Sequence, residues 1–278
     1  MTVSLGDALK VFEKLWPTQL AEDWDVVGLV TGSLSQPIKK VLLTVDVTSD
    51  VVEHAKDVGA DLIFAHHPML LRGVTSISED TSKGLVLAEL VRANIAVYSA
   101  HTNADSVESG TSAVLAKALG LSGSKPLQAL TNSQQGIGQI GSLDSSITLG
   151  ELANKLNEIL PPTATGVRVA GAFDKEVSKV ALCAGAGDSY SLAALDQGAE
   201  VFMTSDLKHH NAQEILELAK ARGVEFALID ISHWAAEFVW LETAKKELQQ
   251  ALPDVTFEVC DLRTDVFDFL MNKQRDSQ

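Results

Sequence analysis

The amino-acid sequence predicts an α/β protein made of two similar, interleaved lobes that arose by internal duplication. Two observations carry this prediction. Runs of β-branched and aliphatic residues alternate along the chain with patterns typical of amphipathic helices. Short strings of the first half also recur in the second half at a constant distance. Strands separated by helices of about ten or more residues are typical of parallel β-α-β units, so we expect parallel sheets.

The first half opens with a predicted helix, because Ser4 and Asp7 precede apolar residues at helical spacing. Farther along, the helix predicted at 48–59 begins with a capping Thr48 or Ser49 and ends on Gly59, a residue favoured at helix C-termini. The remaining elements of this half are predicted as strands at 41–47, 60–67 and 95–101 and helices at 83–94 and 109–120.

The segment 121–147 changes character, because it is rich in Ser, Gly and Gln. It predicts a connection with one strand, "GIGQIGSL" (136–143), and we expect a domain boundary within it. After it the alternation resumes, with predicted helices at 148–160, 188–198, 207–222 and 234–251 and predicted strands at 167–173, 179–187, 199–205, 225–231 and 255–260.

The two halves share short strings at one offset. "KVLLTVDVTSD" begins at Lys40 and "KVALCAGAGDS" at Lys179, while "GADLIF" begins at Gly59 and "GAEVFM" at Gly198, so both pairs lie 139 residues apart. An internal duplication of one strand-helix-strand unit accounts for this offset. Chance similarity between common β-α-β patterns is the alternative.

The composition narrows the classes of function. Lys and Arg number 22 against 37 Asp and Glu, a net charge of −15 that opposes the attraction to phosphates on which nucleic-acid binding depends. The two cysteines, Cys183 and Cys260, do not make a disulfide framework. The start of the chain lacks the features of a signal peptide, and no run reaches the roughly 18 apolar residues of a membrane span. We therefore expect a cytoplasmic protein with neither a nucleic acid nor a membrane as its partner.

Histidines follow the ends of several predicted strands. His66 and His67 end the strand at 60–67, and His101 ends the strand at 95–101. His233 follows the strand at 225–231. Asp105 comes four residues after His101, and Glu237 four residues after His233. Ligands of open parallel sheets bind at the carboxyl ends of the strands, so these side chains are expected to gather at one site.

Imidazole and carboxylate without thiolate suit Zn, Fe, Mn or Co. The number of candidate ligands exceeds what one tetrahedral ion needs, and a carboxylate can bridge two ions, so we expect two divalent ions per chain. For each residue alone, a solvated or hydrogen-bonded histidine or a helix-face pair is the alternative. The convergence of several strand ends favours the metal site.

Six motifs together resemble a known family. They are "WDVVGLVTG" (24–32), "VDVT" (45–48), "AHHP" (65–68), "HTNAD" (101–105), "TSDLKHH" (204–210) and "SHWAAE" (232–237). Their order is similar to that of the Nif-three-like family of dinuclear-metal proteins, whose members often carry the name GTP cyclohydrolase I type 2 homologue. The resemblance runs from Trp24 to Glu237.

The resemblance implies a ligand set, an assembly and an activity. It implies the metal ligands His66, His67, Asp105, His233 and Glu237, places His101 and His210 near the metals, and implies a hexameric ring, a trimer of dimers. Because His66, His67 and Asp105 would share ions with His233 and Glu237, we expect the first and last segments to come together as one metal-binding lobe of residues 1–125 and 230–278. Residues 126–229 are expected to form a second lobe, with the metal site between the two.

The implied function is metal-dependent hydrolysis of a nucleotide such as GTP, with His101 or His210 moving the proton. The alternative is a metal-binding or scaffold ring without catalysis. Three residues depart from the family pattern and put the substrate in doubt, namely Val26, Ser205 and Ser232.

A Gly-rich turn, "CAGAGDSYS" (183–191), is a weaker candidate. Its backbone N–H groups could hold a phosphate, but it matches neither common phosphate-loop pattern, and a tight strand-to-helix turn is the simpler interpretation.

Overall fold

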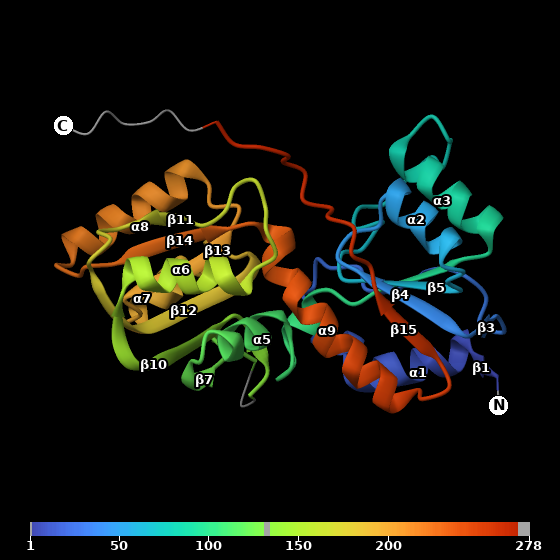
Figure 1. Ribbon diagram of the computed structural model, residues 1–278, viewed down its shortest axis with the longest axis horizontal. Coiled ribbons are helices and arrows are strands. Elements are labelled where there is room, and N and C mark those ends of the chain that lie inside the picture. Colours follow the sequence, from blue (N-terminus) through green and yellow to red (C-terminus); the bar gives the residue numbers. More distant parts are fainter. Residues whose placement is uncertain (1, 131–133, 272–278) are drawn as a thin grey trace. The chain divides into compact units, whose positions relative to one another are not determined.

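The computed structural model describes residues 2–130 and 134–271, which form two compact units (Figure 1). The first unit consists of Met1–Leu115, Gln128–Gly138 and Glu237–Thr264. The second consists of Ala116–Leu127, Gln139–Ala236 and Asp265–Gln278. Both units are mixed α/β, as the sequence predicts.

The first unit is built on a five-stranded sheet. Its strand order is β15 (Thr256–Val259), β4 (Lys40–Thr44), β5 (Leu62–Ala65), β6 (Ala96–Ser99) and β2 (Gly28–Thr31). The first four strands are parallel to one another, whereas β2 is antiparallel to β6. The short strands β1 (Val3–Ser4) and β3 (Pro37–Ile38) pair with each other, as do β8 (Gln128–Ala129) and β9 (Gly136–Ile137).

Helices cover both faces of this sheet. They are α1 (Leu5–Leu15), α2 (Ser49–Asp57), α3 (Ser82–Ala93), the short α4 (Thr102–Asp105) and parts of α5 (Thr111–Ala118) and α9 (His233–Ala251), with a 3₁₀ turn η1 (Thr18–Leu20). Ser4 caps α1 by accepting the N–H of Asp7, as the sequence predicts.

Successive side chains of β5 point to opposite faces of the first sheet, and each face has its own apolar core. Ile63 and Ala65 pack with α2 and α3, which lie on one side of the sheet (Figure 1). Phe64 points to the opposite face, where its ring meets Phe12 of α1 and Trp240 of α9. A strand buried on both faces is a near-continuous apolar run, which explains the sequence before His66.

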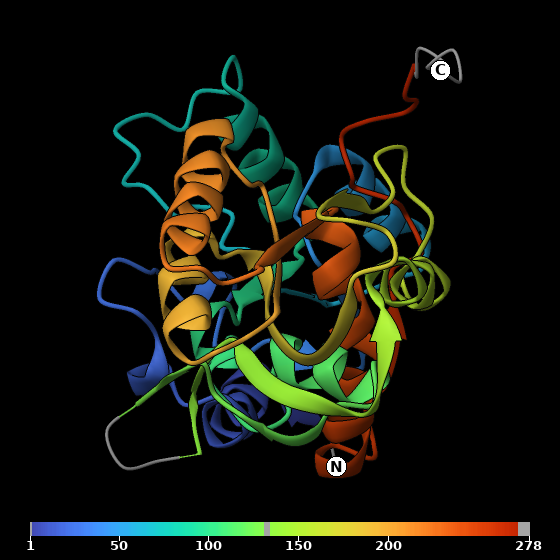
Figure 2. The ribbon, with the colours of Figure 1, turned by 90° about the vertical axis from the view of Figure 1, so that its left-hand side faces the viewer.

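The second unit is built on a six-stranded sheet. Its order is β11 (Arg168–Ala170), β14 (Ala227–Ile231), β13 (Val201–Ser205), β12 (Glu176–Ala186), β10 (Gln139–Thr148) and β7 (Ser122–Lys125). Strands β12, β13 and β14 are parallel, and β11, β10 and β7 are antiparallel to their neighbours. Figure 2 shows α7 (Ser191–Asp196) and α8 (His209–Ala221) on one side of this sheet and α6 (Leu149–Ile159) on the other. A 3₁₀ turn, η2 (Asp188–Tyr190), precedes α7.

The two sheets repeat one topology. In the first unit β4-α2-β5-α3-β6 forms three adjacent parallel strands, and the earlier strand β2 pairs antiparallel with the third. In the second unit β12-α7-β13-α8-β14 does the same, and the preceding strand β11 pairs antiparallel with the third. The repeated order agrees with the predicted internal duplication.

One expectation about secondary structure is wrong. The segment 121–147 was expected to carry one strand, but its described residues contribute to four, namely β7, β8, β9 and β10. Residues 131–133 of this segment lie outside the described residues, as do residues 272–278 of the expected first lobe. All four residues of β7 are exposed, so this strand carries no apolar alternation by which the sequence could reveal it.

Among the described residues, no helix combines the length and apolar character that crossing a membrane requires. Both cysteines, Cys183 and Cys260, are buried and free.

Candidate metal centre

The adjacent histidines are placed by the parallel ladder of the first sheet. Beyond the end of β5, the backbone N–H of His66 donates to Thr44 at 3.0 Å and that of His67 donates to Val45 at 2.9 Å. Pro68 follows and has no N–H to continue the ladder. The two imidazoles are therefore held at the carboxyl edge of the sheet, where ligands of open parallel sheets bind.

Both rings are fixed through Nδ1. The Nδ1 of His66 lies 2.9 Å from the carbonyl oxygen of Ala100, and the Nδ1 of His67 lies 2.7 Å from Oδ1 of Asp46. Since both partners are acceptors, each Nδ1 carries a proton, and Nε2 is the ring nitrogen left to bind a metal. A carbonyl or carboxylate on the far nitrogen is the usual support of a metal-bound histidine.

Two further histidines follow the same rule. In the first unit the Nδ1 of His101 donates to Oδ1 of Asp25 at 2.9 Å. In the second unit the Nδ1 of His233 donates to Oδ2 of Asp206 at 2.7 Å. All four predicted strand-end histidines therefore keep Nε2 as a potential ligand atom.

Two carboxylates approach the imidazoles within the first unit. The Nε2 of His66 lies 3.7 Å from Oδ1 of Asp105 and 3.5 Å from Oε1 of Glu237. The other oxygen of Glu237, Oε2, lies 2.9 Å from Nε2 of His67. The hydroxyl of Thr111 donates to Asp105 and holds that carboxylate in place. Glu237 thus presents one oxygen to each of the adjacent histidines.

Burial and charge together shift the pKa values of this cluster. Burial alone would lower the pKa of His67, but the charge of Glu237 and the hydrogen bond to Asp46 outweigh it and raise that pKa to about 10. Burial would also lower the pKa of His66, but the charges of Glu237 and Asp105 prevail and raise it. Burial raises the pKa of Asp105, against the pull of His66 and His101.

The cluster fits a divalent cation. The Nε2 of His66 is fully buried and has no hydrogen-bond partner among the described residues. Two ligands on one tetrahedral zinc ion stand about 3.3 Å apart, close to the separations between this nitrogen and the two carboxylates. Buried carboxylates facing lone pairs are costly unless a cation lies between them.

A third nitrogen extends the cluster. His66, His67 and His101 each offer a ring nitrogen within 4.8 Å of the others. Asp25 binds the ring of His101 with one oxygen and accepts the N–H of Thr102 with the other at 3.0 Å. Burial raises the pKa of Asp25, but its bonds to His101 and Thr102 prevail and lower it to about 2. His101, the strand-end residue of β6, is therefore anchored by a permanent negative charge.

The remaining predicted site residues belong to the second unit. His233 begins α9, and this helix continues to Glu237 in the first unit, so the two residues lie one turn apart on one helix face. His210 is exposed on the first turn of α8, where its ring contacts that of His209. The roles of His233 and His210 stay predictions.

Sequence reasoning missed the acids that orient the histidines. Asp46, Asp25 and Asp206 belong to the motifs "VDVT", "WDVVGLVTG" and "TSDLKHH", but no role follows from the motifs alone. The available signal was position, because Asp46 and Asp206 follow the ends of β4 and β13 at the edge where His67 and His233 were expected.

Two backbone groups of the Gly-rich turn form hydrogen bonds with a side chain of the neighbouring strand β13. The Thr204 hydroxyl accepts the N–H of Gly187 at 2.8 Å and donates to the carbonyl of Gly185 at 2.9 Å. The bond engages one of the backbone N–H groups that a phosphate could use, and it supports the tight-turn interpretation. Trp234 and Trp240 are buried, as core residues are.

Comparisons with known proteins agree with this architecture. The family model described as Duf34/NIF3 (NGG1p interacting factor 3) matches residues 3–266. A Streptomyces coelicolor protein named "GTP cyclohydrolase 1 type 2 homolog" is 39% identical over 249 residues, which cover 88% of this chain and 86% of that protein. A Clostridium perfringens protein of the same name is 32% identical and covers 96% of this chain and 100% of its own length.

Solved structures show the same fold. A Bacillus cereus protein related to NIF3 superposes with a TM-score of 0.87 at 24% identity, covering 97% of this chain and 99% of the other. A hypothetical protein from Staphylococcus aureus gives a TM-score of 0.85 at 28% identity, with coverage of 97% and 100%. The family match spans nearly the whole chain, and the chain belongs to the Duf34/NIF3 family.

Proposed function

We propose that this protein is a dinuclear metal-dependent hydrolase that acts on a nucleotide such as GTP. The observation that carries the proposal is the buried Nε2 of His66, which has no hydrogen-bond partner among the described residues and lies 3.5 and 3.7 Å from two carboxylates. The names of the relatives, "GTP cyclohydrolase 1 type 2 homolog", support the choice of nucleotide.

The proposed ligands of the two ions are imidazoles and carboxylates of this chain. His66, His67, Asp105 and Glu237 would hold the ions, and Glu237 presents one oxygen near each of the two adjacent histidines. His233, one helical turn before Glu237, is the proposed fifth ligand. Zn, Fe or Mn suits these ligands, and such ions would supply a Lewis acid that makes water nucleophilic at neutral pH.

His101 is the proposed proton carrier. Its Nδ1 is held by Asp25, so its Nε2 can accept a proton beside the other two imidazoles. The proposed reaction is hydrolysis at the imidazole carbon of guanine, in which water adds to this carbon, a carbon–nitrogen bond of the five-membered ring breaks, and the released nitrogen takes up the proton. His210 is the second candidate for this role, because the resemblance implies that it lies near the metals.

Metal content and turnover, measured on the same samples, test this proposal. Wild type is expected to hold close to two ions per chain, and His66→Ala and Glu237→Ala are expected to lose both metal and GTP turnover. His54→Ala, on α2 and outside the cluster, is the matched control and should keep both. Two ions without turnover of GTP would favour the non-catalytic scaffold or another substrate. No metal after supply of zinc, iron and manganese would contradict the ligand assignment.

We also propose that the chain works in the cytoplasm as a homohexamer, the assembly that the resemblance implies. Exposed apolar side chains near the C-terminus support association, because Val266 is 80% exposed and Phe269 is 77% exposed. Native mass spectrometry would show six copies per particle, and a monomer at micromolar concentration would contradict the assembly.

A further inference from the structure

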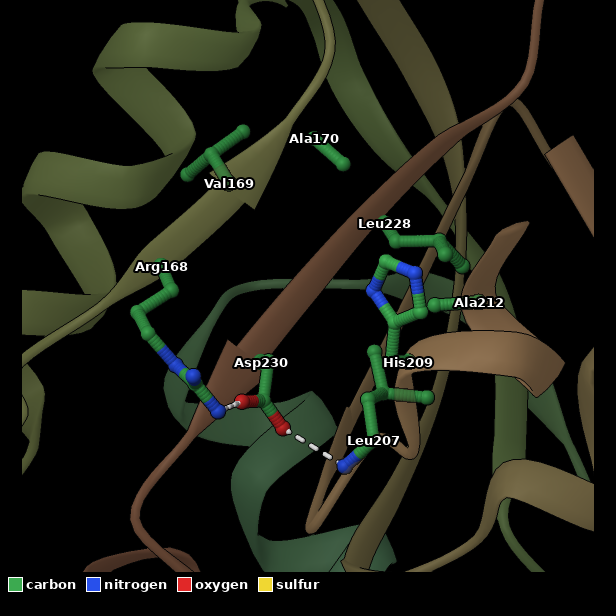
Figure 3. Close-up of a pocket in the computed structure, with 8 residues that line it drawn as sticks. All are labelled: Arg168, Val169, Ala170, Leu207, His209, Ala212, Leu228 and Asp230. Atoms are coloured by element: carbon green, nitrogen blue, oxygen red, sulfur yellow. Dashed lines mark hydrogen bonds and ion pairs between the residues drawn. The ribbon is translucent and has the colours of Figure 1, made fainter.

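The second unit contains a cavity of about 290 Å³ between α8 and the paired strands β11 and β14 (Figure 3). Its polar lining comes from Arg168, Asp230 and His209, and its apolar lining includes Ala170, Ala212 and Leu228. The proposed hydrolase does not use this cavity.

Strand register explains how the lining residues meet. Arg168 pairs with Asp230 across the two strands, and Ala170 pairs with Leu228. Residues two apart on a strand share a face, so these four side chains lie on one side of the sheet. Polar groups therefore occupy the end of the cavity near the carboxyl end of β14, and apolar groups continue from it along the strands.

The two partners of the ion pair in the cavity differ in their exposure to solvent. The Asp230 side chain is 9% exposed, and it accepts hydrogen bonds from the Arg168 guanidinium and, at 3.1 Å, from the N–H of Leu207. The Arg168 side chain is 63% exposed. A guanidinium has five N–H donors, which is more than this carboxylate engages. The buried carboxylate of Asp230 therefore orients the Arg168 guanidinium and leaves N–H groups that can bind an oxyanion.

The same place in the first unit has the opposite polarity. There Asp25, just before β2, bonds to His101, just after β6. In the second unit Arg168 of β11 bonds to Asp230 near the end of β14, the strands that correspond by topology. The first unit thus presents lone pairs to a cation, whereas the second presents a guanidinium to an anion.

We propose that this cavity, the Arg168 pocket, binds a small organic anion, with its carboxylate or phosphate on Arg168 and its apolar body against Ala170, Ala212 and Leu228. His209 lies at the first turn of α8, where the positive end of the helix dipole also favours negative charge. The ligand class follows from one oriented guanidinium beside an apolar wall.

Ligand-observed NMR on the full chain tests the Arg168 pocket. Phenyl phosphate and benzoate are expected to bind, and their relative affinities distinguish phosphate from carboxylate. Benzyl alcohol, which has the same ring without the charge, is expected to bind at least tenfold more weakly. Arg168→Met should weaken the better anion by about tenfold or more, the loss expected for a charge-assisted hydrogen bond.

Three further variants separate the possible outcomes. Arg222→Met breaks another Arg–Asp pair of the same unit, to Asp196 at 2.6 Å, and should leave binding unchanged. His66→Ala should also leave it unchanged, which separates this pocket from anion binding at the metal centre. Ala212→Phe fills the cavity while leaving Arg168 in place, so it should abolish binding even if Arg168→Met does not fold. Wild-type affinity in folded Arg168→Met or in Ala212→Phe would overturn the proposal, as would equal binding of benzyl alcohol.

Discussion

Four histidines of this protein donate a hydrogen bond from Nδ1 to an acceptor. For His67, His101 and His233 the acceptor is a carboxylate, and for His66 it is the carbonyl oxygen of Ala100. The acceptor fixes the tautomer and the ring plane and makes Nε2 more basic. At the scale of residues, the candidate metal centre is therefore a set of oriented ring nitrogens, and we expect its metal affinity to depend on the groups that hold the rings.

Replacing one of these supporting acids should weaken metal binding without unfolding the protein. Asp46→Asn removes the charge on Nδ1 of His67, and we expect the metal Kd to rise by about 10–100-fold with an unchanged circular dichroism spectrum. Competition with a chelating dye gives the Kd. Asp50→Asn, exposed in the first turn of α2, is the control. An unchanged Kd in Asp46→Asn would show that the bond does not support a ligand.

The raised pKa of His67 predicts how the stability of chelator-treated protein depends on pH. The folded pKa is about 10 and the ordinary value is 6.5, so the protonated ring stabilises the fold fully below pH 6.5. That contribution is lost as the pH rises through about 10. We expect the Tm of chelated protein to fall across this window.

Glu237→Gln tests the origin of this dependence. Burial lowers the pKa of His67, and among the groups that raise it the charge of Glu237 has the strongest effect. The variant should therefore show a flatter decline of Tm with pH, whereas His54→Gln should keep the wild-type slope. A wild-type slope in Glu237→Gln would assign the dependence to other groups.

At the scale of elements, one residue can both end a strand and cap the helix that follows it. Thr148 ends β10 and caps α6, accepting the N–H of Glu151 at 3.1 Å while the Glu151 carboxylate accepts the N–H of Thr148 at 2.8 Å. This reciprocal pair satisfies donors that the first turn of a helix otherwise leaves unbonded. The chain passes from β10 of the second sheet into α6 at this point.

Thr148→Ala should lower the free energy of unfolding by about 1 kcal/mol, the usual cost of losing a cap. Urea denaturation followed by circular dichroism measures it. Glu158→Ala, at the far end of α6 and without a part in the cap, should change the stability by less than about 0.5 kcal/mol. Equal losses in both variants would contradict a specific role of the cap.

At the scale of the whole molecule, one α/β topology occurs twice, with different side chains at the carboxyl edge of each sheet. The carboxyl edge of the first sheet carries three imidazoles, and that of the second carries an Arg–Asp pair beside a cavity. The repeated topology places imidazoles at the carboxyl edge of one sheet and an Arg–Asp pair at the corresponding edge of the other. The chain as a whole carries a net charge of −15.

That charge predicts no affinity for nucleic acid. Retention of the protein on immobilised double-stranded DNA should be absent even at about 50 mM salt, where contacts to phosphates are strongest. The measurement is elution volume against a salt gradient. Retention that falls steeply with salt would reveal a basic surface that the overall charge conceals.

The sequence alone was sufficient to predict the alternation of strands and helices, because the parallel strands are near-continuous apolar runs and the helices between them bury a periodic apolar face. Strand direction also predicts that the imidazoles of His66, His67 and His101 meet at one edge of the first sheet, and their ring nitrogens lie within 4.8 Å of one another. The exposed strand β7 escaped prediction because a solvated edge strand needs no apolar alternation.

Only the tertiary structure decided which groups pair. Asp46 and His67 lie 21 residues apart in the sequence, and Asp25 and His101 lie 76 apart. These contacts depend on which strands are neighbours and in what register, and neither is encoded by local periodicity. The same holds for Arg168 and Asp230, 62 residues apart and directly opposite across β11 and β14. The residues carry the chemistry, and strand pairing brings them to within bonding distance.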